Sequence, residues 1–167
     1  MSTWKRLGIG LVILLIISGL VLGLEALRAR SFVEAGDAQV TLQPGSIPIY
    51  LNGRILVAFS PADLESLKMA SFVEPEEGKT EEGWLLYDVI RLYLLEDFLD
   101  AGVKVKISSS SRDKTVELTW AEIADQSNMV MFDLSGRGTL KLVSKMASLD
   151  DRDEWVQDVD RIEVNTP

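Results

Sequence analysis

Val103–Asp125 has the sequence VKVKISSSSRDKTVELTWAEIAD, and this stretch decides the fold that we expect for the domain around it. From Val103 to Ile107 apolar residues alternate with lysine, a pattern that predicts a half-buried strand. Polar residues then turn the chain, and the apolar residues from Val116 onward predict the returning strand of a hairpin. Thr119 and Glu122 have the spacing of a capping box, which predicts a short helix up to the end of the stretch.

A second hairpin is predicted upstream of this stretch. Residues 47–51 and 55–59 are expected to form its strands, because Asn52-Gly53 between them is the strongest short-range hairpin signal. Ser60-Pro61 then predicts a helix start, with serine as the cap and proline at the first helical position. Residues 70–73 are predicted to form a further strand. Many short strands with few helices indicate a mixed α+β domain of mostly β character.

The segments around and after this stretch complete the expected domain. Residues 84–99 have apolar side chains at helical spacing, which predicts a strong amphipathic helix. Strands are expected over residues 129–134, 139–143 and 159–164. Between residues 74 and 82 we expect an acidic loop that is mobile and solvated. Its charged residues include Glu76, Glu77, Glu81 and Glu82.

An uninterrupted apolar run, Leu7–Leu24, lies near the N-terminus and contains neither charge nor proline. As a helix it would be about 27 Å long, close to the hydrocarbon thickness of a bilayer. It predicts a single-pass membrane anchor in residues 1–30, with the transmembrane helix over about residues 7–26. The expected organisation continues with a spacer and first strand over residues 31–46 and one domain over residues 47–167.

The orientation of the anchor follows from the flanking charges. Lys5-Arg6 and the α-amino group precede the run, whereas Glu25 accompanies Arg28 and Arg30 after it. The positive-inside rule therefore predicts a cytoplasmic N-terminus and an extracytoplasmic domain. A cleaved signal peptide is the alternative, but the apolar run is longer than usual and lacks a clean cleavage site. A buried core helix is a third alternative and is disfavoured, because the run is apolar on every side.

Two glycines within the run, Gly19 and Gly23, form a G-x-x-x-G motif. Small residues one turn apart let a partner helix approach closely in lipid, so these two positions are candidates for helix packing. Glycine is also common in membrane helices in general, and the motif is compatible with that simpler explanation.

Composition narrows the chemistry that is available. The chain has no cysteine and no histidine, which excludes thiolate nucleophiles, Ser-His-Asp mechanisms and the usual zinc and haem sites. Residues 1–30 hold four basic and one acidic side chain, a net charge of +3. The remaining residues hold thirteen basic and twenty-five acidic side chains, a net charge of −12, which disfavours nucleic acid and anionic lipid as partners of the domain.

Several segments recur in an order that resembles a known family. They are SPADLESL from Ser60, EEGWLLYDVIRLYL from Glu81, the stretch Val103–Asp125, MVMFDLSGRGTLKLV from Met129 and EWVQDVDRIEV from Glu154. Together they resemble the sulfite-oxidase-type molybdopterin-binding domain in its small single-domain form, over roughly residues 50 to 164. The resemblance implies a compact mixed fold of mostly β character with helices around it.

The chain departs from that family at the positions that carry its chemistry. The resemblance implies a cysteine ligand to molybdenum and histidine and arginine contacts to the cofactor, and this chain has neither cysteine nor histidine. A loop that often contains Asp-Gly in relatives contains Arg112-Asp113-Lys114 here. We therefore expect the fold to be kept without catalytic residues, cofactor or metal.

Candidate binding residues remain in two predicted loops. Arg112 and Arg137 are suited to forked recognition of a carboxylate or phosphate, and solvent-exposed loop charges are the alternative explanation for both. The acidic run from Asp150 lacks the glycine of a calcium loop and indicates a solvated surface. Core packing is the simpler explanation for the other candidates, which are Met129, Met131, Trp84, Trp120 and Trp155.

Three functions are consistent with these observations. The first is a non-catalytic, membrane-anchored accessory subunit that docks onto a larger membrane complex, of the respiratory or redox kind. The second is an extracytoplasmic solute- or cofactor-binding module that uses a degenerate molybdopterin-type pocket through Arg112 and Arg137. The third is an enzyme with carboxylate chemistry.

Overall fold

The computed structural model describes residues 42–167, which form one body with mixed α+β architecture, mostly β, in two sheets with few helices. This mixed, mostly β character agrees with the class expected from the sequence. Within residues 42–167 no helix is long and apolar enough to cross a membrane. The predicted anchor and its two packing glycines, Gly19 and Gly23, lie outside the described residues.

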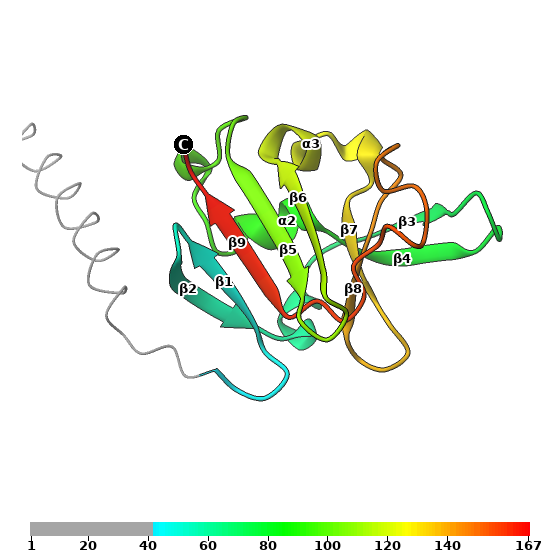
Figure 1. Ribbon diagram of the computed structural model, residues 1–167, viewed down its shortest axis with the longest axis horizontal. Coiled ribbons are helices and arrows are strands. Elements are labelled where there is room, and N and C mark those ends of the chain that lie inside the picture. The colour runs from blue at the N-terminus through cyan, green and yellow to red at the C-terminus, as the bar shows by residue number, and fades with distance from the viewer. Residues whose placement is uncertain (1–41) are drawn as a thin grey trace, which may run out of the picture. The chain divides into compact units, whose positions relative to one another are not determined.

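Sheet A has five strands in the order β2-β1-β9-β5-β6. All neighbours are antiparallel except β1 and β9, which run parallel. The last strand of the chain therefore lies in the middle of the sheet (Figure 1). The strands are β1 (Ile47–Leu51), β2 (Arg54–Phe59), β5 (Lys104–Ser109), β6 (Lys114–Thr119) and β9 (Arg161–Asn165).

Sheet B has four antiparallel strands in the order β3-β4-β7-β8. The turn between β3 and β4 projects beyond the rest of the domain in Figure 1, at the right of the view. The strands are β3 (Met69–Val73), β4 (Thr80–Leu85), β7 (Met131–Leu134) and β8 (Leu140–Val143).

The helices are short and connect the strands. Two are α-helical, α2 (Leu86–Arg91) and α3 (Trp120–Ala124). Three are 3₁₀ turns, η2 (Pro61–Leu64), η3 (Glu96–Phe98) and η4 (Gln126–Asn128).

Sheet B separates two apolar clusters, because successive residues of a strand point to opposite faces. Trp84 and Phe132 lie on the face toward the main core, which the strands of sheet A and both α-helices also line. The opposite face carries a small second core of Phe72, Met131 and Val143, which Trp155 completes. The Trp155 indole nitrogen donates to the Leu149 carbonyl at 2.8 Å, so its polar end is satisfied within the core.

Several sequence predictions are confirmed. The first hairpin joins β1 to β2 through Asn52 and Gly53, whose φ angles of 49° and 79° are both positive, as the tightest hairpin turns require. The capping box of α3 is present, with the Glu122 carboxylate accepting from the Thr119 amide at 2.7 Å and the Thr119 hydroxyl accepting from the Glu122 amide at 3.3 Å. The hairpin of β5 and β6 is confirmed as well.

The predicted long helix over residues 84–99 is wrong. Trp84 and Leu85 belong to β4, and α2 ends at Arg91. Leu92 and Leu95 fit the helical spacing, but they follow the end of α2 and are exposed. The predicted acidic loop over residues 74–82 is also wrong in its second half, because β4 begins at Thr80.

Smaller differences concern the ends of elements. The strand predicted from residue 129 begins at Met131, since Met129 has a left-handed backbone that ends η4. The closing strand begins at Arg161 rather than at residue 159. The helix predicted after Ser60 is a single 3₁₀ turn.

Candidate functional site

Arg112 lies at the tip of the hairpin that joins β5 to β6. The tip turns through Asp113, which has a positive φ of 49°, and this turn places the arginine beside the start of β9. Its Nε donates to Oδ2 of Asp158 at 2.7 Å. The loop is held from the other side, where the Ser110 amide donates to Oδ2 of Asp160 at 2.8 Å.

Arg137 lies in the loop between β7 and β8, in the other sheet. This loop is closed at its base by the Ser135 amide, which donates to the Thr139 carbonyl at 2.9 Å. Gly138 provides the positive φ of 78° that the turn needs. Nη2 of Arg137 donates to both carboxylate oxygens of Asp158, at 3.1 and 3.2 Å.

Asp158 joins the two loops. It also accepts a hydrogen bond from the Thr139 hydroxyl at 2.7 Å, and its own backbone has a φ of 56°, uncommon for a residue other than glycine. The segment around it is pinned to both sheets, because the Val159 amide donates to Leu140 and the Asp160 amide donates to Ser108. Asp158 therefore holds a hairpin of sheet A and a loop of sheet B together at one end of the domain.

The environment of Asp158 favours its ionised form. Hydrogen bonds from the Thr139 hydroxyl and the Arg112 guanidinium hold the pKa of the Asp158 carboxyl below its usual value. An anion that approaches Arg112 or Arg137 from solution must compete with this carboxylate, which the fold already supplies to both arginines.

A cavity of about 290 Å³ lies beside this cluster. Asp158 and Asp160 are the only charged residues among those that line it. Oδ1 of Asp160 is buried and has no hydrogen-bond partner among residues 42–167. The charged lining of the cavity is therefore acidic, and neither Arg112 nor Arg137 belongs to it. Its lining consists of Gly45, Ser46, Ile47, Pro61, Ser111, Gly138, Thr139, Leu140, Asp158, Val159 and Asp160.

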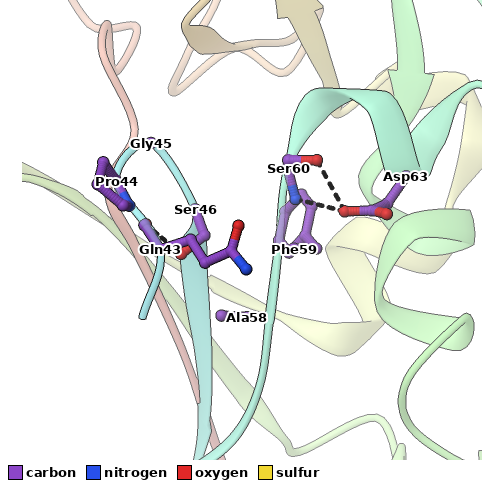
Figure 2. Close-up of a pocket in the computed structure, with 8 residues that line it drawn as sticks. All are labelled: Gln43, Pro44, Gly45, Ser46, Ala58, Phe59, Ser60 and Asp63. Atoms are coloured by element: carbon purple, nitrogen blue, oxygen red, sulfur yellow. Dashed lines mark hydrogen bonds between the residues drawn. The ribbon is translucent and has the colours of Figure 1, made fainter. Parts of the chain in front are cut away.

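A second hollow, of about 400 Å³, lies on the other side of the turn at Gly45 and Ser46. Figure 2 shows the turn and η2 facing each other across it, with the Gln43 side chain directed toward the Ser60 side. Oδ2 of Asp63 accepts from the Ser60 amide at 2.7 Å and from its hydroxyl at 2.8 Å. These bonds lower the pKa of Asp63, and they complete the cap of η2, so the polar groups of Ser60 and Asp63 satisfy each other.

Sequence reasoning missed a buried charged group on sheet B. Nζ of Lys141 lies 2.7 Å from Oε2 of Glu81 and 3.0 Å from Oδ2 of Asp133, and it sits 4.9 Å from the centre of the Trp155 ring. Glu81 is only 4% exposed, whereas the sequence predicted a solvated loop residue. Burial raises the pKa of Glu81, and a hydrogen bond with Asp133 acts in the same direction. Lys141, Glu81 and Asp133 come from three different strands, so no local sequence pattern predicts that they meet.

The structure accounts for most of the other candidates. Met131 and the three tryptophans Trp84, Trp120 and Trp155 are buried in the two cores, as predicted. Asp150, Asp151 and Asp153 are exposed, and Asp158 is the acidic residue of this region that organises its neighbours. No group of acidic residues within the described part of the chain is arranged to hold a metal ion. The cofactor-binding role of Arg112 and Arg137 stays a prediction, although the structure brings the two residues together on one carboxylate.

In comparisons with known proteins, no family model matches the chain, and no curated protein matches it.

Replacing Asp158 with asparagine is expected to lower the free energy of unfolding at pH 7 by about 1–2 kcal/mol, because charge-assisted hydrogen bonds to two loops are weakened. The folded-state pKa of Asp158 is depressed, so its contribution is present above the unfolded-state pKa of about 4 and is lost as the pH falls. The difference between the variant and the natural protein should therefore shrink at pH 3. Thermal unfolding at both pH values measures it, with the exposed Asp150→Asn as control; a difference independent of pH would contradict the assignment.

Proposed function

We propose that this chain is a non-catalytic accessory subunit, anchored in a membrane by residues 7–24, whose domain docks onto a larger membrane complex of the respiratory or redox kind. The domain is proposed to be a sulfite-oxidase-type molybdopterin-binding domain without the family's catalytic residues, and to lie outside the cytoplasm. The ordered sequence segments and the mixed, mostly β architecture support the family, and the lack of cysteine and histidine in the whole chain supports the loss of its chemistry.

The observation that carries the docking proposal is an exposed apolar patch after α2. We name Leu92, Leu95 and Phe98 the docking patch; these side chains are 44%, 49% and 42% exposed within seven residues of chain. The patch is held rigidly, because Leu94 and Leu99 between and beside its members are buried in the main core. Apolar side chains fixed in this way on a surface mark an interaction site.

The charges around the docking patch indicate the kind of partner. Glu96, Asp97 and Asp100 are exposed beside it, and Arg91 pairs with Glu96, which leaves the surroundings acidic. An acidic rim disfavours the anionic surface of a bilayer and suits a protein surface that is apolar at its centre and basic at its edge. An anchor in the same membrane raises the effective concentration of the two surfaces, so even a weak contact suffices.

The cavity beside Asp158 favours a second candidate function. A solute- or cofactor-binding module would use this cavity, whose charged lining residues, Asp158 and Asp160, suit a ligand that donates hydrogen bonds. Binding through Arg112 and Arg137 is less favoured, because Asp158 already occupies both side chains.

Native purification distinguishes the two functions. In mild detergent, the natural chain should co-purify with a stoichiometric set of membrane proteins, and Leu95→Ser with Phe98→Ser should reduce that recovery roughly 10- to 30-fold, as expected for interface residues of this size. Leu134→Ser is the matched control, because Leu134 is similarly exposed but lies on β7, outside the docking patch. Equal recovery with the double variant would overturn the role of the docking patch, and an isolated chain carrying a stoichiometric small molecule would support the second function.

A further inference from the structure

The outer strand of sheet B, β3, has one edge without a partner in the described part of the chain. The order β3-β4-β7-β8 makes β3 and β8 the two edges of the sheet. The β8 edge is covered, because the Leu142 amide donates to the Val156 carbonyl at 2.8 Å. In Figure 1 the β3 edge lies at the side of the domain where the β3–β4 turn projects.

The register of β3 on β4 shows which backbone groups face outward. The Glu74 amide donates to the Lys79 carbonyl at 2.8 Å, and the pairs continue as Val73 with Thr80 and Phe72 with Glu81. Hydrogen-bonded and non-hydrogen-bonded pairs alternate in an antiparallel ladder. The amides and carbonyls of Ala70 and Phe72 therefore bond to β4, whereas those of Met69, Ser71 and Val73 point away from the sheet.

The side chains of β3 leave this edge unprotected. Exposed edge strands usually carry charges or proline that block pairing with another chain. The outer strands of sheet A follow this rule, since β2 contains Arg54 and β6 contains Lys114 and Glu117. The sequence of β3 is MASFV, which has no charge and no proline, and Met69 and Val73 are 48% and 60% exposed.

We infer that β3 pairs with β3 of a second copy of this chain, antiparallel and with Ser71 on the two-fold axis. The outward groups of Met69 then face those of Val73 in the second copy, and Ser71 faces Ser71, which gives about six backbone hydrogen bonds, two for each facing pair. Met69 and Val73 lie on the same side of the strand, one on each side of Ser71, so the pairing also brings these exposed apolar side chains of the two copies together.

The charges at the ends of β3 favour this self-pairing. Exposed Lys68 precedes the strand, and the turn that follows carries exposed Glu76, Glu77 and Lys79. Glu77 is paired with Arg152 and lies near Lys79, so Glu76 is the acid of this turn that is left to face a lysine. An antiparallel arrangement about Ser71 places the lysine end of each copy beside the acidic turn of the other. β3 itself carries no charge, so no like charges face each other between the two paired strands, although each chain has a net charge of −9.

The absence of natural cysteine from the chain permits a direct test. Facing residues of a hydrogen-bonded antiparallel pair have Cα atoms about 5.5 Å apart, within the range of a disulfide. The full-length chain with Ser71→Cys, in mild detergent with a gentle oxidant, should therefore form a disulfide-linked dimer. Thr115→Cys is the matched control, because Thr115 is an exposed hydroxyl residue on the outer strand of sheet A. Equal dimer yields from the two variants, or none from Ser71→Cys, would overturn the inference.

A mixing experiment tests the register and separates this contact from association through the membrane helix. Met69→Cys should form a disulfide with Val73→Cys when the two variants are co-expressed. Each variant alone should form far less dimer. In this register the same residue of the two copies is offset by four positions, which is about 13 Å along the strands. Preferential self-linkage of either variant would contradict pairing about Ser71, as would a mixed dimer no more abundant than the self-linked ones.

Discussion

The Gly83→Ala variant is expected to fail to fold to a stable domain. A methyl group at Gly83 would lie 1.9 Å from the Phe132 carbonyl oxygen, 2.6 Å from the Phe132 carbonyl carbon and 2.9 Å from the Asp133 Cα. These atoms belong to the backbone of β7 in the interior of sheet B, where Gly83 pairs with Asp133, so no side chain can rotate away to make room. Relief requires β4 and β7 to separate, which also disrupts the packing of Trp84 in the main core.

The expected cost exceeds about 3 kcal/mol, a large part of the total stability of a domain of this size. Thermal unfolding of the full chain in detergent, followed by circular dichroism, should show a midpoint lowered by more than about 10 °C or no transition at all. Gly136→Ala is the control, because nothing lies within 4 Å of a methyl group there. A Gly83→Ala midpoint within about 2 °C of the natural protein would show that the strands adjust more freely than the structure indicates.

The second large effect is expected from replacing Lys141 with methionine. Lys141 is the cation that Glu81 and Asp133 share, and its side chain is 15% exposed beside 4% and 18% for the two acids. Methionine fills similar space and removes the charge, which leaves the buried Glu81 carboxyl facing the partly buried Asp133 carboxyl. Breaking a buried ion pair from one side costs about 3–5 kcal/mol, because the remaining charge is not compensated.

The pH dependence of the Lys141→Met variant distinguishes this mechanism from a loss of packing. The pKa of Glu81 is already raised in the folded protein, and removal of the lysine raises it further. A carboxyl with a raised folded-state pKa stabilises the fold at low pH and loses that contribution as the pH rises, so the penalty should be smaller at pH 5 than at pH 8. Lys106→Met is the control, since Lys106 lies 3.8 Å from Glu163 on an exposed surface and should cost about 0–1 kcal/mol. A penalty that is the same at both pH values would indicate packing alone.

Local patterns predicted the parts of the fold that depend on local physics. Asn52 and Gly53 provide two positive φ angles in succession, and Thr119 and Glu122 satisfy the backbone of one helix end, so each motif needs only its own few residues. The segment over residues 84–99 failed for the opposite reason. Trp84 and Leu85 belong to β4, which pairs with β3 on one side and with β7 on the other. Both partner strands lie outside residues 84–99, so the helical pattern within that segment contained no information about them.

The candidate site shows the same limit. Arg112 and Arg137 were predicted to recognise the carboxylate or phosphate of a ligand, which stays a prediction, and the structure pairs both with one carboxylate of the protein itself. That carboxylate is supplied by Asp158, 46 and 21 residues further along the chain, in an acidic run that the sequence indicated to be a solvated surface. The buried position of Glu81 depends similarly on Lys141, 60 residues away. Long-range pairing of charges leaves no periodic trace in a sequence.

The position of β9 has a consequence for the order in which the domain can be made. This strand lies between β1 and β5, and the Asn52 amide also donates to the Val164 carbonyl at 2.9 Å. Until residues 161–165 have left the ribosome, the β1–β2 hairpin has no connection to the rest of sheet A. Closing that gap joins residues more than a hundred positions apart, which is entropically slow. Sheet A is therefore completed only after the last strand of the domain has been synthesised, whereas sheet B contains no residue of that strand.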